Sequence, residues 1–271
     1  DVYKRQVLLV SCKGKTGNTI TVGSDKLDNT QSYFSESMHK AARCDSGYYY
    51  LDKCGASADN LMFYDDKSEE SIVLCNKPQC GHDGEECMAY ISGSEFKSEL
   101  YYYNSYIYMI SSKGNLVRIS ADGTQRTDLG SICVLSGQDS VSMCFNDGYA
   151  YVSQEITGDI EGNVTVRLHR FNLDTGLSDK IYEETGYGIG INSLKTYGSD
   201  TFFLKTSVSK DDKGLYSLEG KGIFRITGEN TECLLDKNVY SYCIDADNNK
   251  LYYSGLGDGT VSYTHLRAHE T

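Results

Sequence analysis

Short stretches in which apolar and polar residues alternate recur along this chain, and they predict β-strands. The aromatic ones are Gly47–Leu51, Tyr102–Tyr108, Gly148–Val152, Gly198–Phe203 and Lys250–Tyr253. No apolar face with helical spacing runs long enough to predict a substantial helix. The pattern therefore predicts an all-β protein.

The stretches belong to a repeated unit. In three units the aromatic strand is followed by a second strand built around an arginine, and a polar turn comes next. These arginines are Arg118, Arg170 and Arg225, which stand about 50 positions apart, as expected for four-stranded propeller blades carrying loop insertions. A β-sandwich should not repeat one order of strands and turns three times. We therefore predict a β-propeller over residues 41–260, with about four blades plus a partial fifth.

With this order of strands, the chain resembles the TolB-like and YWTD-type propellers of uncharacterised bacterial surface lipoproteins. The resemblance covers about Ala41 to Thr260. It implies a propeller held outside the cytoplasm and does not specify a role. Because a closed ring usually needs more blades than are visible, we expect the ring to be incomplete, with six or more blades in the full protein.

Both ends of the chain look foreign to the protein. Residues 1–6 can be encoded by one strand of a sequencing-library adapter, and residues 261–271 by a sequence that opens with its complementary strand. Such segments are set aside before the fold is considered. We therefore expect the gene to have been cut at both sides.

A lipid attachment signal follows the first adapter segment. Residues 7–11 look like the end of a lipoprotein signal peptide, with Leu9, Val10 and Ser11 standing before Cys12. We expect Cys12 to carry the lipid, and the polar residues 12–40 to form a tether. The alternative is a short buried strand with a core cysteine.

Composition narrows the possible partners. The 23 Tyr, 8 Phe and 27 Gly suit strands and turns, and no apolar run approaches the length of a membrane helix. The net charge of −12 disfavours nucleic acid, which needs clustered Lys and Arg. It also disfavours docking on anionic lipid, so contact with the membrane would depend on the Cys12 lipid.

One segment is dense in potential metal ligands. Cys75, Cys80, His82 and Cys87 lie within thirteen residues, among Pro78, Gly81 and Gly84, which allow tight turns. Thiolates and an imidazole suit tetrahedral Zn²⁺, and a closed set of four predicts a structural site. The spacing differs from common zinc fingers, but the segment resembles one that recurs in the propeller lipoproteins.

Disulfides are the alternative for this segment, since they form readily outside the cytoplasm. Three cysteines cannot all pair among themselves, so one would need Cys44 or Cys54. Those two are poor partners for each other, because an extended strand between them would hold them far apart. Two further pairs stand near blade boundaries and could form disulfides across a turn or be small buried residues: Cys133 with Cys144, and Cys233 with Cys243.

No catalytic motif stands out in the chain, and His169 is interpreted as structural. The repeated arginines, Arg118, Arg170 and Arg225, could line a ligand-facing end, pair with acids of their own blades or simply be exposed to solvent. The leading hypothesis is a non-enzymatic, extracytoplasmic binding module, lipid-anchored at the cell surface, with a protein, peptide or carbohydrate ligand. The alternatives are an accessory propeller of a surface glycan- or peptide-processing enzyme whose catalytic part is missing, and a structural scaffold.

Overall fold

The chain is described by a computed structural model over residues 41–93, 95–96, 99–158, 162–197, 200–228, 230–245, 250–255 and 261–265. These residues form strands, turns and loops, and no helix among them could cross a membrane. The prediction of an all-β protein is confirmed.

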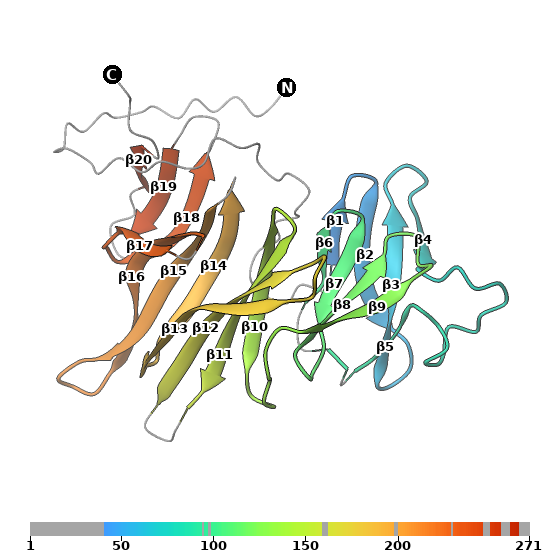
Figure 1. The fold of residues 1–271 in the computed structure, drawn as a ribbon, viewed down its shortest axis with the longest axis horizontal. Coiled ribbons are helices and arrows are strands. Elements are labelled where there is room, and N and C mark those ends of the chain that lie inside the picture. Colours follow the sequence, from blue (N-terminus) through green and yellow to red (C-terminus); the bar gives the residue numbers. More distant parts are fainter. Residues whose placement is uncertain are drawn as a thin grey trace.

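The strands form five antiparallel sheets, each made of neighbours in sequence (Figure 1). Blade 1 contains β1 (Ala41–Cys44), β2 (Gly47–Lys53), β3 (Ala58–Asp65) and β4 (Glu70–Val73), with β5 (Tyr90–Ser92) also paired to β3. Blade 2 contains β6 (Tyr101–Tyr103), β7 (Tyr106–Ile110), β8 (Asn115–Ser120) and β9 (Arg126–Ser131). Blade 3 contains β10 (Ser140–Asn146), β11 (Tyr149–Thr157), β12 (Asn163–Asn172) and β13 (Ser178–Tyr187).

Blade 4 contains β14 (Gly190–Tyr197), β15 (Asp200–Lys210), β16 (Tyr216–Thr227) and β17 (Asn230–Leu235). Blade 5 has three strands, β18 (Val239–Asp245), β19 (Lys250–Gly255) and β20 (Val261–His265). The described residues thus form four full blades, the first of them extended by β5, and a partial fifth, as predicted. The blades form an open arc that does not close into a ring (Figure 1).

The first strand of each sheet is the inner one. Neighbouring first strands contact each other in the order β1, β6, β10, β14 and β18. The aromatic stretches of the sequence mostly form the second strands. Tyr102–Tyr108 is an exception, because it divides into β6 and β7 at Asn104 and Ser105, both of which have positive φ. Two such residues make a tight hairpin turn, so the single strand expected there was wrong.

Strand β20 pairs with β19 in regular antiparallel register. Its residues, Val261–His265, fall in the segment attributed to adapter sequence. Backbone pairing requires no particular side chain, so a strand there is compatible with either origin of the segment. The assignment of residues 261–271 to the adapter stays a prediction, and residues 1–40, including Cys12 and the tether, lie outside the described residues.

Aromatic side chains fill the spaces between blades. Phe145 of blade 3 is fully buried against Tyr103 and Tyr108 of blade 2, with ring centroids 5.0 and 4.7 Å away. Tyr49 of blade 1 stacks on Tyr102 of blade 2 at 5.6 Å. These ring contacts join blade 1 to blade 2 and blade 2 to blade 3, so neighbouring blades stabilise each other there.

The repeated arginines make contacts within their own blades. Arg170 pairs with Asp179 at 3.3 Å, and Arg225 pairs with Glu232, in each case across to the outer strand of the same sheet. Arg118 lies over the ring of Tyr106 at 4.6 Å. Pairing with blade acids, one of the three interpretations of these arginines, is therefore confirmed for Arg170 and Arg225.

A buried chain of polar groups runs through blade 3. The amide nitrogen of Gln154 donates to Asp139 at 2.8 Å and to the carbonyl of Val134 at 2.9 Å. Its amide oxygen therefore faces His169, whose Nε2 lies 3.2 Å away and must donate. Burial, helped by the charges of Arg167 and Lys180, lowers the pKa of His169 to about 4. His169 is thus neutral and structural.

This histidine should make stability depend on pH. Its pKa lies near 6.5 in the unfolded chain and near 4 in the fold, so between these values the unfolded state binds more protons and stability falls as pH falls. Between about pH 7 and about pH 5 we expect this effect of His169 to lower the free energy of unfolding by roughly 1–2 kcal/mol, allowing for solvent screening. Urea unfolding of the unchanged protein and of His169→Gln at both pH values gives the loss of unfolding free energy for each. The loss should be larger in the unchanged protein by this amount. Equal losses in the two proteins would contradict it.

Candidate metal centre

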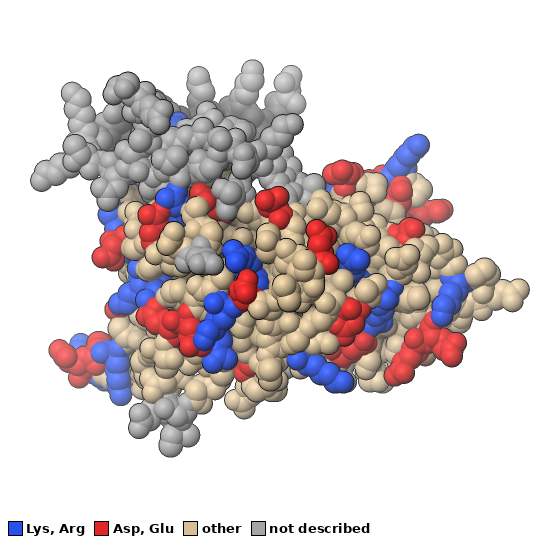
Figure 2. Space-filling model, in the orientation of Figure 1, with Lys and Arg blue, Asp and Glu red and all other residues tan. Residues whose placement is uncertain are grey.

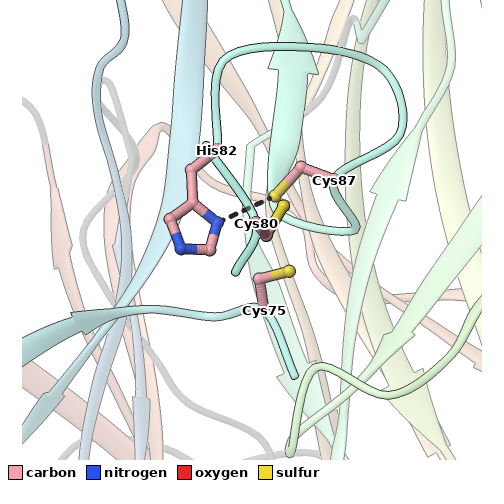
Figure 3. A group of neighbouring side chains, drawn as sticks. All are labelled: Cys75, Cys80, His82 and Cys87. Carbon is pink, nitrogen blue, oxygen red and sulfur yellow. Dashed lines mark hydrogen bonds between the residues drawn. The ribbon is translucent and has the colours of Figure 1, made fainter. Parts of the chain in front are cut away.

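All four predicted ligands lie in the loop between β4 and β5, at the edge of blade 1 (Figure 3). Cys75 stands near the end of β4, and Cys87 stands three residues before β5. Cys87 is buried, whereas Cys75, Cys80 and His82 are half-buried. The two strands thus fix the ends of the loop, and the loop brings the other two ligands back between them.

The ligand atoms converge. The three sulfur atoms and a ring nitrogen of His82 all lie within 4.8 Å of one another. His82 Nδ1 is 3.3 Å from Cys87 Sγ, the contact marked in Figure 3. In a tetrahedral zinc site, sulfurs about 2.3 Å from the metal are about 3.8 Å apart. The group is therefore close to the size that a four-coordinate metal requires, and it could hold a metal ion.

The backbone of the loop turns sharply to achieve this. Gln79 and His82 both adopt positive φ, at 59° and 56°. The N–H of Cys87 donates to the carbonyl of Gly84 at 2.9 Å, and the N–H of Tyr90 donates to the carbonyl of Cys87 at 3.2 Å. Residues other than glycine seldom adopt this conformation, so the loop holds strained positions at one of its ligands.

Backbone N–H groups point at the sulfurs. Burial alone would raise the pKa of Cys75, but hydrogen bonds from the N–H groups of Lys77 and Met88 and from the Cys87 thiol hold this pKa below its usual value. Burial raises the pKa of Cys87 to about 11, although the N–H of Ala89 donates to its sulfur. N–H donors that stabilise thiolate are typical partners of metal-bound cysteine.

The loop also packs against blade 2. In the turn between β8 and β9, Gly123 approaches so closely that a Cβ there would lie 2.6 Å from the carbonyl oxygen of Leu74 and 3.1 Å from the nitrogen of Cys75. Arg126 of β9 also contacts the segment that follows the loop. It donates to the carbonyl of Tyr90 at 3.0 Å and pairs with Glu95. The ligands therefore lie at the interface of blades 1 and 2.

The cysteines in the described part of the chain are all free thiols. Cys133 and Cys144 are buried, while Cys233 and Cys243 are exposed. Cys54, one of the two partners considered for the cysteines of the loop, follows β2 and lies beside the site. Its thiol donates to the carbonyl of His82 at 3.4 Å. The pairing of β2 with β3 and the return of the loop bring these residues together.

Comparisons with known proteins give distant likenesses only. No family model and no curated protein matches the chain. Among solved structures, an oligogalacturonate lyase from Vibrio parahaemolyticus has 10% identity and a TM-score of 0.49, over 79% of this chain and 58% of the lyase. BamB from Moraxella catarrhalis has 8% identity and a TM-score of 0.27, over 92% of this chain and 96% of BamB.

The chain thus spans about 58% of the length of that lyase. The sheet order of the chain itself defines the class to which it belongs, a β-propeller protein with a Cys₃His group beside its first blade.

Proposed function

We propose that this chain is the propeller of an extracytoplasmic binding protein in which Cys75, Cys80, His82 and Cys87 hold a structural Zn²⁺. The convergence of these four ligand atoms within 4.8 Å is the observation that carries the metal assignment. Three sulfurs and one imidazole nitrogen favour Zn²⁺ over Mg²⁺, Ca²⁺ or Mn²⁺, which prefer oxygen ligands. Four protein ligands leave no open position for a substrate, so the metal would stabilise the fold rather than catalyse a reaction.

The place of the loop explains what the metal would stabilise. The loop packs on the turn of blade 2 at Gly123, and Cys75, Cys80 and Cys87 belong to the same apolar core as Ile119 and Ala121. A metal ion would hold the two ends of the loop together and thereby fix this interface. With a metal bound, the Cys₃His group would therefore stabilise the contact between blades 1 and 2.

Cobalt tests the geometry of the site directly. The 271-residue chain, with its metal exchanged for Co²⁺, should show the strong visible absorption of a tetrahedral, thiolate-bound ion. Replacing His82 by Ala should weaken or shift these bands, whereas Cys233→Ser, which changes an exposed cysteine outside the site, should leave them unchanged. The weak spectrum of octahedral Co²⁺ would reject the assignment.

The binding role rests on architecture. Propeller loops and the ends of inner strands gather around the axis of the arc, where ligands meet loops rather than sheet faces. On the face in Figure 2, basic and acidic side chains are interspersed over the described residues. Such a surface, with a net charge of −12, suits a protein, peptide or carbohydrate ligand better than nucleic acid.

Display at the membrane would come from Cys12. In the protein made by its own cell from the complete gene, we expect cleavage after Ser11 and a diacylglycerol on the Cys12 thiol. Mass spectrometry of the N-terminal peptide from the membrane fraction checks this, and Cys12→Ala should release the protein from that fraction. An uncut Ser11–Cys12 bond would disprove the lipid anchor.

A further inference from the structure

The hairpin of blade 4 extends past the strands on either side of it. Strands β15 and β16 pair as far as Lys210 with Tyr216, whereas β17 pairs only with residues 223–227 of β16. Residues 216–219 therefore have β15 on one side and, within the described part of the chain, no strand on the other. The hairpin projects from the arc at the lower left of Figure 1.

The backbone groups of Tyr216 and Leu218 point toward this open edge. The hairpin closes with the N–H of Asp211 donating to the carbonyl of Leu215 at 2.9 Å. In an antiparallel pair, residues that bond across the ladder alternate with residues whose N–H and C=O groups point away from it. Ser217, two residues after Leu215, therefore bonds to β15, and its two neighbours do not.

The next residue in this alternation, Gly220, also points away from β15. Its N–H donates to the side chain of Asn238 at 2.8 Å. The outward N–H and C=O groups of Tyr216 and Leu218 have no such partner among the described residues. An edge with unpaired backbone groups is a template for pairing with another strand.

The side chains of Tyr216 and Leu218 lie on one face of this edge and are 59% and 51% exposed. Tyr187 of blade 3 stacks on the Tyr216 ring at 6.2 Å, and Lys210 Nζ lies 5.2 Å from the ring centre. Blade 4 has a neighbour on each side, since β14 contacts both β10 and β18. The exposure of these side chains is therefore not a result of the open end of the arc.

We propose that this edge of β16 pairs with the same edge of a second copy of the chain. A two-fold axis at Ser217 places Tyr216 opposite the partner's Leu218, and Leu218 opposite the partner's Tyr216. Residues directly opposite each other share a face, so the outward backbone groups and the apolar side chains are satisfied in the same register. The edge is thus complementary to itself.

Charge does not oppose this contact. Residues 207–221 contain three lysines and three acids, namely Lys210, Lys213, Lys221, Asp211, Asp212 and Glu219. The hairpin is therefore neutral, although the chain carries a net charge of −12, and two copies can approach here with little local repulsion. An interface of so few residues falls below about 1,200 Å², so the dimer should be transient. This inference depends on neither the metal nor the ligand proposed above.

Sedimentation equilibrium of the 271-residue chain tests the pairing. Dimers should appear as the concentration rises from about 10 µM to about 1 mM, the range of a weak interface. Leu218→Lys changes both halves of the interface and should raise the Kd about tenfold or more. Leu177→Lys is the matched control, because Leu177 is also exposed, at 68%, but lies in the turn between β12 and β13. It should leave the Kd unchanged.

Leu218→Pro tests the backbone pairing separately. Proline removes an N–H that points away from β15, so the ladder within the hairpin stays intact. The variant should keep the circular dichroism spectrum of the unchanged protein and no longer dimerise. If proline disturbs the spectrum, the comparison of Leu218→Lys with Leu177→Lys decides.

A cross-link identifies the register. In a chain whose exposed Cys233 and Cys243 are replaced by serine, Ser217→Cys should give disulfide-linked dimers on oxidation with copper–phenanthroline, because the axis brings the two Cα atoms together. Ser209→Cys, one strand further from the axis, should not. A dimer that survives both changes at Leu218, as one formed through the open end of the arc would, overturns the inference. A chain that stays monomeric throughout leaves the edge to a strand of another protein and overturns it too.

Discussion

Replacing Cys80 by serine is expected to remove the metal and to destabilise the protein by about 4 kcal/mol or more. Loss of a structural metal is among the few single changes with effects of this size. The remaining ligands would leave buried Cys87 and half-buried Cys75 without the ion that joins them, and the loop would lose its hold on the turn at Gly123. Chemical unfolding of the two proteins, with metal content measured beside it, gives the difference.

The control for this experiment is Cys233→Ser. Cys233 is an exposed free thiol on β17, far along the chain from the metal-site loop. A serine there should change the free energy of unfolding by no more than about 0.5 kcal/mol. If Cys80→Ser lowered the free energy of unfolding no more than this control, the metal would not stabilise the contact between blades 1 and 2.

The second large effect is expected from Phe145→Ala. Phe145 is fully buried and touches the rings of Tyr101, Tyr103 and Tyr108 from the preceding blade. Removing the ring should leave a cavity between blades 2 and 3 and lower the free energy of unfolding by about 4 kcal/mol. Urea unfolding measures this value.

Two companion variants show whether the space between blades is responsible. Phe145→Leu keeps much of the volume and should cost about half as much. Tyr216→Ala removes an exposed ring that stacks on Tyr187 at 6.2 Å and lies 5.2 Å from Lys210 Nζ, and it should cost about 1 kcal/mol or less. A cost for Phe145→Ala no larger than that for Tyr216→Ala would contradict the account of packing between blades.

Much of the fold could be predicted because every blade repeats its own local pattern. Alternation along Gly148–Val152 and around Arg170 predicted β11 and β12, and the repeat of this order predicted the sheets. The hairpin at Asn104 and Ser105 was missed, since the aromatic pattern on its two sides is continuous and only the positive φ of the turn residues divides it.

The convergence of the Cys₃His group was predictable for a different reason. Its four ligands lie close in sequence, so short-range spacing alone indicated that they could meet. The contact of the loop with Gly123 depends on how strands far apart in sequence are arranged, and no spacing encodes it.

The metal content of the purified 271-residue chain, determined beside a count of reactive thiols, tests the central claim most directly. The account predicts one zinc ion per chain and three more reactive thiols after chelation than before, corresponding to Cys75, Cys80 and Cys87. A chain that contains no metal, and whose missing thiols are recovered only by a disulfide reductant, would contradict it.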